Sequence, residues 1–289
     1  MINETLLQFD KNTQLFSVNQ TVLDGIDFRA LAIEKLFNKK YHYIIIKNFI
    51  SEFTAKNIRD FYSSEKSFLQ NNNEGNHRLF YYLNSPYRYP RFITSLINHC
   101  MVIKNRIYEY HDFYQIYCMI KGVNPKNYRE VSRLQNLHSW SSIYWYKNGN
   151  SHFRHIDFFG ELACFVNFTK KGTDFIGGGL RVEVDGSLLE MDDYLDYGDL
   201  VLLDQSQVFH EVLPVQTVGD QIGRMQLYVP TIPPNYMKNI LKYEGHPFRG
   251  YFTGENLSLA KKITLWLKSI ANPSIHYSRK LFPHQRYEI

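Results

Sequence analysis

The stretch "RHIDFFGELACFVNF" at residues 154–168 places two ionisable residues directly before an apolar run. His155 and Asp157 are separated by one residue, and burying such a pair beside apolar side chains is costly unless something compensates their charge. In an extended strand, residues i and i+2 point to the same face, so the imidazole and the carboxylate converge. A facial iron(II) site needs one further imidazole. We therefore interpret this stretch as a strand that carries part of a metal site.

The sequence around this stretch, from about residue 130 to 230, has the pattern of short apolar runs that is typical of a β protein. Short strand-like runs such as "SSIYWY", "LRVEV", "LVLLD" and "RMQLYVP" alternate with clusters of Gly, Asn and Asp. Strands of five to eight residues with turns at this density predict a β-sandwich or a barrel. Because no helix follows it, the "GGG" at 177–179 is interpreted as a turn or bulge rather than a phosphate cradle.

The segments outside this β region are expected to be mostly helical. No linker rich in Pro, Gly or Ser separates them, so residues 1–289 are expected to form a single domain. The expected parts are a helical N-terminal part at 27–125 with a strand at 41–50 and a polar loop at 71–76, a β core at about 130–230, and C-terminal helices at 234–272. Ser51 is expected to cap the helix after the early strand.

Composition limits the classes of function. The net charge is +5 and the basic residues are scattered, so a nucleic-acid partner is not expected. The three cysteines form no CxxC motif, and Cys164 lies in an apolar strand, which favours a reducing, cytoplasmic location. Neither a secretory signal nor a stretch of about 18 uninterrupted apolar residues is found, so no transmembrane segment is expected. The oligomeric state is left open, a homodimer included.

Two further residues extend the pattern that begins at His155. His210 follows the segment "DYGDLVLLDQSQVF" and is expected at the start of a strand. Arg224, in "GRMQLYVP", is expected on the next strand, and a hairpin is expected to bring the two positions side by side. Alone, each would be read as an ordinary strand histidine or a salt-bridge arginine; the joint order of the residues favours a site.

This pattern resembles the Fe(II)- and 2-oxoglutarate-dependent oxygenases, with closest similarity to their phytanoyl-CoA dioxygenase-like branch. The resemblance covers about residues 130–230, and "YHYIIIKNFIS" at 41–51 is similar to that branch's opening strand and capped helix. It implies a mainly β fold with flanking helices, a double-stranded β-helix or jelly-roll, cupin-like barrel. It also implies Fe(II) bound by His155, Asp157 and His210, with O2 as oxidant and 2-oxoglutarate anchored by Arg224.

One position departs from the family pattern. Many members carry Ser or Thr two residues after the arginine, where this chain has Gln226. A glutamine amide can still donate a hydrogen bond to a carboxylate. Tyr144 is a further candidate for the second anchor, and Tyr146, Ser141 and Arg133 remain alternatives.

The resemblance implies hydroxylation of an unactivated C–H bond of a small molecule, with release of succinate and CO2. Related halogenases have Gly or Ala in place of Asp157, so its carboxylate favours hydroxylation or another non-halogenating oxidation. His138, His152 and Tyr146 are candidate substrate contacts. Two alternatives remain: a cupin-type metal enzyme that does not use 2-oxoglutarate, and a barrel that binds a ligand without turnover.

Overall fold

The computed structural model describes the N-terminal four fifths of the chain with several gaps. The described residues are 4–32, 42–65, 69–73, 76–82, 90–110, 118–119, 122–128, 130–131, 141–156, 162–205 and 208–229. The expected C-terminal helices at 234–272 therefore lie outside the described residues, as do Asp157, His138 and Arg133.

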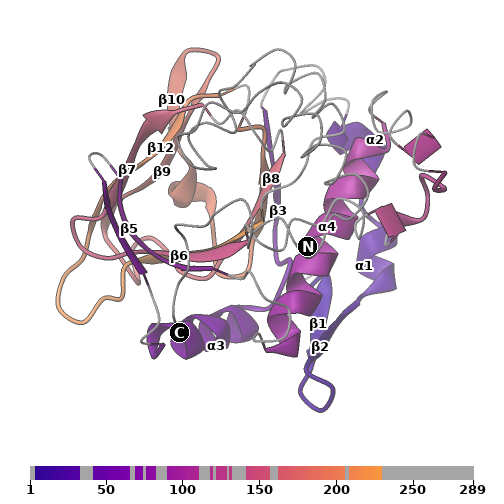
Figure 1. Cartoon of the computed structure of the whole chain (residues 1–289), viewed down its shortest axis with the longest axis horizontal. Coiled ribbons are helices and arrows are strands. Elements are labelled where there is room, and N and C mark those ends of the chain that lie inside the picture. The colour runs from indigo at the N-terminus through magenta and orange to yellow at the C-terminus, as the bar shows by residue number, and fades with distance from the viewer. Residues whose placement is uncertain are drawn as a thin grey trace, which may run out of the picture.

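The centre of the molecule is a barrel formed by one continuous antiparallel sheet, with eleven strands among the described residues (Figure 1). Its two halves, each with four core strands, are called the first and the second sheet below. The first sheet has the order β6-β13-β8-β11, formed by Ser142–Tyr146, Arg224–Val229, Ala163–Asn167 and Leu200–Leu203. The second has the order β7-β12-β9-β10, formed by Ser151–His155, His210–Gln216, Gly177–Val184 and Ser187–Glu190. Strands that follow one another in the chain mostly alternate between the sheets. This is the double-stranded β-helix, so the predicted fold class is confirmed.

The N-terminal part contributes strands as well as helices, which corrects the expectation of a helical part at 27–125. Strand β3 (Tyr43–Ile46) extends the first sheet beyond β11, in agreement with the predicted strand. Most of the polar segment predicted as a loop belongs to strands, because residues 71–73 end β4 (Leu69–Asn73) and Asn76 begins β5 (Asn76–Tyr82), which pairs with β4. Strand β5 pairs with β6 and with β7 and so joins the two sheets.

A smaller hairpin and short helices precede the barrel strands. Strand β1 (Leu7–Asp10) pairs with β2 (Leu15–Val18), and the helices α1 (Gln20–Asp24) and α2 (Phe28–Ala30) follow. A polar segment without hydrophobic alternation is predicted as a loop from its sequence. It can still form a strand when a neighbouring sheet offers hydrogen-bond partners to its backbone.

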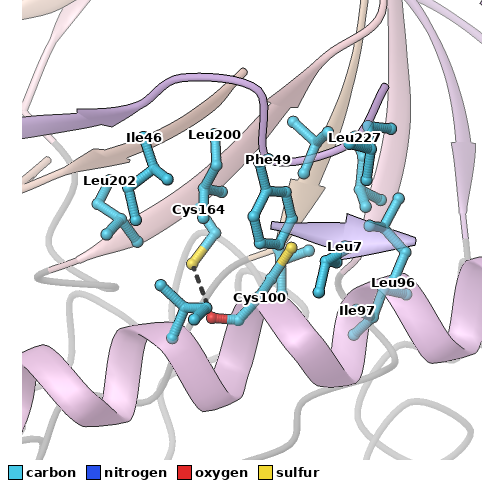
Figure 2. Close-up of a cluster of buried hydrophobic side chains, with 14 of the residues drawn as sticks. Leu7, Ile46, Phe49, Leu96, Ile97, Cys100, Cys164, Leu200, Leu202 and Leu227 are labelled. Atoms are coloured by element: carbon cyan, nitrogen blue, oxygen red, sulfur yellow. Dashed lines mark hydrogen bonds between the residues drawn. The ribbon is translucent and has the colours of Figure 1, made fainter. Parts of the chain in front are cut away.

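Two longer helices cover the outer face of the first sheet. Helix α3 (Glu52–Ser63) begins as predicted, because the Ser51 hydroxyl accepts a hydrogen bond from the Thr54 amide at 3.1 Å. Helix α4 (Arg91–Tyr108) lies within the helical part expected at 27–125. Figure 2 shows Cys100, Leu96 and Ile97 of α4 packed below Cys164, Leu200 and Leu227 of the sheet.

The strands of the first sheet send alternate side chains to two different cores. On β13, Met225 and Leu227 lie in the outer core with α4, whereas Tyr228 packs into the core inside the barrel. Because successive strand residues alternate in direction, Arg224 and Gln226 share the inward face with Tyr228. The same alternation sends Tyr144 and Tyr146 of β6 into the barrel and buries Ile143 and Trp145 outside it.

The glycine run at 177–179 begins strand β9 and lies opposite a bulge in β12, because Leu213 to Gln216 spans three steps against two from Gly179 to Gly177. The predicted bulge therefore belongs to the partner strand. Gly178 and Gly179 have φ angles of +74° and +104°, and the register between β9 and β12 shifts beside them. A Cβ on Gly179 would lie 2.2 Å from Oδ2 of Asp192. Glycine is therefore required here by its backbone conformation and by the approach of a buried carboxylate.

The hairpin expected between His210 and Arg224 is wrong. Strand β12 pairs with β7 and β9, and β13 pairs with β6 and β8, so the two residues belong to opposite sheets. The segment between them crosses from one sheet to the other, as connections in jelly rolls do. Within the described ranges, no helix is both long and apolar enough to span a membrane.

Candidate functional site

Two of the predicted metal ligands lie directly opposite each other on neighbouring strands. His155 ends β7 and His210 begins β12, and the two are register partners in the second sheet. Their ring centroids are 4.3 Å apart, with an angle of 53° between the ring planes. The structure therefore brings together two imidazoles that are 55 positions apart in the sequence.

Backbone carbonyls define the tautomer of both histidines. Nδ1 of His155 lies 2.7 Å from the Phe153 carbonyl oxygen, and Nδ1 of His210 lies 3.2 Å from that of Val208. A carbonyl only accepts, so in each neutral ring Nδ1 carries the proton and Nε2 presents its lone pair. A backbone carbonyl on the distal ring nitrogen is a common way of orienting a histidine that binds a metal.

His152 is brought next to His155 by a bulge in β7. His155 pairs with His210 and His152 with Val212, so three steps along β7 match two along β12. The extra residue turns both histidines to one face, and their ring centroids are 4.4 Å apart. His152, predicted as a substrate contact, thus lies beside the histidine pair.

The third predicted ligand, Asp157, follows the last described residue of this segment, Ile156. Within the described ranges, no three His, Cys, Asp or Glu side chains are grouped so that they could hold a metal ion. The roles of His155, His210 and Asp157 as metal ligands therefore stay predictions, as does the substrate contact predicted for His138.

Gln205 contacts His210 directly, a contact that the sequence analysis did not anticipate. It follows β11 and is buried, with 4% of its surface exposed. Its Nε2 lies 3.1 Å from Nε2 of His210, and its Oε1 lies 3.4 Å from the hydroxyl of Tyr228. Side chains from opposite sheets, Tyr228 on β13 and His210 on β12, are therefore connected through one amide inside the barrel.

Arg224 is a fully buried arginine at the start of β13. Its Nε donates a hydrogen bond to Oδ2 of Asp192 at 2.7 Å, and its guanidinium carbon lies 5.9 Å from the centre of the Tyr146 ring. Nη1 and Nη2 are buried and have no hydrogen-bond partner among the described residues. A buried charged donor without a partner is costly, so this guanidinium is suited to an anion that contacts both terminal nitrogens.

Asp192 is a second residue of the candidate site that the sequence did not reveal. It lies in the short helix η3 (Met191–Tyr194) and is 4% exposed. Its Oδ2 accepts hydrogen bonds from the Leu180 amide at 2.5 Å and from Arg224. Two carboxylates adjoin in "MDDY", and nothing in that local sequence distinguishes the buried Asp192 from the exposed Asp193.

The remaining predicted side chains line the barrel near Arg224. Gln226 is buried and is the register partner of Tyr144, while Arg224 is the partner of Tyr146. The Tyr144 ring stacks on Tyr228, with centroids 5.1 Å apart and planes 19° apart. Tyr228 shares the face of Arg224 at spacing i+4, so strand alternation alone could have identified it as a wall of the site.

Comparisons with known proteins agree with this architecture. No protein-family model matches the chain, and no curated protein matches it in sequence. Among solved structures, a prolyl hydroxylase from Trichoplax adhaerens, in complex with a hypoxia inducible factor peptide fragment, matches with a TM-score of 0.52 and 13% identity. This match covers 79% of this chain and 98% of that chain.

Two bacterial structures are also similar. A Pseudomonas putida prolyl-4-hydroxylase has a TM-score of 0.48 and 13% identity, covering 71% of this chain and 96% of that one. A 2OG-Fe(II) oxygenase family oxidoreductase from Burkholderia pseudomallei has a TM-score of 0.44 and 11% identity, covering 72% and 91%. The Trichoplax match shows that this chain shares the fold of that prolyl hydroxylase. The phytanoyl-CoA dioxygenase-like branch stays a prediction.

Proposed function

We propose that this chain is a non-haem Fe(II)- and 2-oxoglutarate-dependent dioxygenase that hydroxylates an unactivated C–H bond of a small molecule. The observation that carries the proposal is Arg224. Its guanidinium is buried in the barrel, is held at Nε by Asp192, and keeps both terminal nitrogens without a partner among the described residues.

The geometry of Arg224 suits one end of a dicarboxylate. A carboxylate can accept two parallel hydrogen bonds from a guanidinium fork, and such bidentate pairs are among the strongest polar contacts in proteins. Asp192 neutralises the guanidinium in the absence of a ligand. Because Asp192 contacts only Nε, the terminal nitrogens Nη1 and Nη2 are left to bind that ligand. Gln226 and Tyr144 are adjacent across the β13–β6 pairing and are proposed as the second anchor of the same carboxylate.

The donor set fits iron(II). His155 and His210 present Nε2 lone pairs from adjacent strands, and Asp157 is proposed as the carboxylate that completes a facial set. When bound, iron with 2-oxoglutarate and O2 supplies an oxidant that removes hydrogen from a C–H bond, with succinate and CO2 as products. The residues of the chain orient the imidazoles, hold the keto acid's distal carboxylate and surround the target with protein.

The interior next to this site is aromatic. Tyr144, Tyr228 and Phe165 form a contiguous group, with the Phe165 and Tyr228 ring centroids 5.3 Å apart. Rings with apolar bodies and polar tips suit a small organic substrate with a few polar groups. This supports a metabolite as the substrate class.

Anaerobic titration with Fe(II) and 2-oxoglutarate tests the proposal. We expect a weak visible charge-transfer band, and its absence would favour a barrel that binds a ligand without turnover. Arg224→Lys keeps a positive charge beside Asp192 and removes the fork. Losing charge-assisted hydrogen bonds of about 1.5–3 kcal/mol should weaken 2-oxoglutarate binding roughly 10- to 150-fold.

A matched control is Arg181→Lys. Arg181 donates two hydrogen bonds to Glu211 across the β9–β12 pair and is partly exposed. This variant should leave the 2-oxoglutarate affinity unchanged. An equal loss in both variants would indicate a general effect of the Arg-to-Lys change, and no loss in Arg224→Lys would favour a metal enzyme that does not use 2-oxoglutarate.

Activity gives a second test. His155→Ala and His210→Ala should each abolish substrate-stimulated succinate release, measured by screening metabolite pools. Turnover retained in either variant would refute its assignment as a metal ligand.

A further inference from the structure

We infer that Gln205 is a positioning residue that couples metal binding at His210 to the binding of an anionic ligand on that metal. The inference rests on the proposed function and extends it to a side chain outside the predicted site. Its basis is the contact of 3.1 Å between Nε2 of Gln205 and Nε2 of His210.

The hydrogen bonds of His210 determine which way the Gln205 amide faces. Nδ1 of His210 donates to the Val208 carbonyl, so Nε2 of the neutral ring can only accept. The atom of Gln205 that faces it must therefore be the amide nitrogen. The amide oxygen then faces Tyr228, whose hydroxyl donates to it at 3.4 Å.

This arrangement places a donor on the lone pair that a metal ion would use. A cation at Nε2 of His210 and the Gln205 N–H cannot occupy the same lone pair, so metal binding must displace the amide. Because Gln205 is 4% exposed, the displaced N–H group has little access to water. A buried donor without a partner is unfavourable, so the displaced amide needs a new acceptor nearby.

An anionic oxygen bound to the metal next to His210 supplies that acceptor. A keto acid that chelates the metal brings carboxylate and carbonyl oxygens, and these accept hydrogen bonds from an amide. Gln205 therefore opposes the metal when it binds alone and favours the anion once the metal is present. In thermodynamic terms, its amide adds a positive coupling free energy between the two ligands.

The local backbone holds Gln205 in this position. The backbone N–H of Gln205 donates a hydrogen bond to the Leu203 carbonyl at 3.0 Å, in a tight turn at the end of β11. The neighbouring Asp204 amide donates to the His42 carbonyl at 2.9 Å. The turn thus delivers the side chain to the end of the barrel where β12 begins with His210.

Gln205→Met tests the inference, because methionine keeps the length of the side chain and removes its amide. The probes are Mn(II), followed by electron paramagnetic resonance of the unbound ion, and 2-oxoglutarate added to the Mn(II)-loaded full chain. One neutral hydrogen bond corresponds to changes of about three- to tenfold. We expect Mn(II) alone to bind tighter by that factor in the variant, and 2-oxoglutarate to bind weaker by a similar factor.

Tyr228→Phe is the companion variant. It removes the hydroxyl that holds the Gln205 oxygen and keeps a ring that can stack on Tyr144. Smaller changes of the same sign are expected. A purely structural role of Gln205 predicts weaker binding of both ligands, so such a result, or unchanged affinities in Gln205→Met, would overturn the inference.

The failure of this inference is distinct from the failure of the proposed function. If the unmodified chain binds no Mn(II), the proposed function and the inference fall together. If it binds Mn(II) and 2-oxoglutarate and Gln205→Met leaves both affinities unchanged, only the role of Gln205 is refuted.

Discussion

Replacing Asp192 by Asn should strongly destabilise the fold, because it removes the negative partner of a fully buried arginine. Arg224 is 0% exposed and Asp192 is 4% exposed, and their contact is 2.7 Å long. The asparagine oxygen can still accept a hydrogen bond from the Leu180 amide. It cannot neutralise the guanidinium, which then remains charged inside the barrel.

The magnitude follows from that burial. Breaking a buried ion pair by removing one partner costs about 3–5 kcal/mol, chiefly because the remaining charge is uncompensated. A domain has only about 5–15 kcal/mol of stability, so the loss is a large fraction of the total. At roughly 2–4 °C per kcal/mol, the midpoint of thermal unfolding should fall by roughly 6–20 °C.

Urea unfolding followed by circular dichroism measures the loss, with Asp193→Asn as the control. Asp193 is the next residue, and its carboxylate is about half exposed and pairs with Lys171. Exposed pairs contribute about 0–1 kcal/mol, so this variant should be close to the unmodified chain.

A double variant, Asp192→Asn with Arg224→Met, measures the interaction energy between the two side chains. Because it leaves no unpaired charge, its loss of stability should be smaller than the sum of the two single losses. If Asp192→Asn stays within about 1 kcal/mol of the unmodified chain, below the range for a broken buried pair, or if the single losses are additive, the pair is not the buried neutralising contact described above.

Three further predictions concern a glycine, a thiol and a carboxylate. At Gly186 φ is +75° and the space for a Cβ is open, so Gly186→Ala should lower the free energy of unfolding in urea by about 1–2 kcal/mol. Gly179→Ala adds a contact of 2.2 Å with a buried carboxylate oxygen and should lower it clearly more. Equal losses of stability would contradict the steric argument. Burial raises the pKa of the Cys164 thiol to about 12, so Ellman's reagent should react with it only after denaturation, and rapid reaction of the native chain would refute this. Hydrogen bonding to Lys170 lowers the pKa of Asp196, so the ionised carboxylate adds a small stabilisation that is present above about pH 4 and is lost as pH falls through the lowered pKa. The stability of Asp196→Asn should therefore decline less steeply on acidification than that of the unmodified chain. Parallel pH profiles of the two chains would count against this prediction.

Local patterns in the chain predicted strand β3 and most barrel strands, but not the N-terminal strands β1, β2, β4 and β5. The short strand-like runs "SSIYWY" and "RMQLYVP" predicted two strands that the structure has at Ser142–Tyr146 and Arg224–Val229. The order of His155, His210 and Arg224 pointed to one barrel. The Ser51 cap was also predicted, because a cap depends on residues only three positions apart. These features are local, since backbone geometry sets the strand period and the cap geometry within a few residues.

The contacts that complete the site come from closure of the barrel. Strand pairing places His210 and Arg224 in opposite sheets, and the folded barrel brings Arg224 to Asp192 of the short helix η3. Gln205 is only five residues from His210, but their contact depends on the turn that directs the Gln205 side chain into the barrel. Of the two adjacent aspartates, only Asp192 is buried and pairs with Arg224, whereas Asp193 is exposed. Such choices depend on which strands pair and in which register, and that depends on packing between distant residues, which short-range periodicity does not encode.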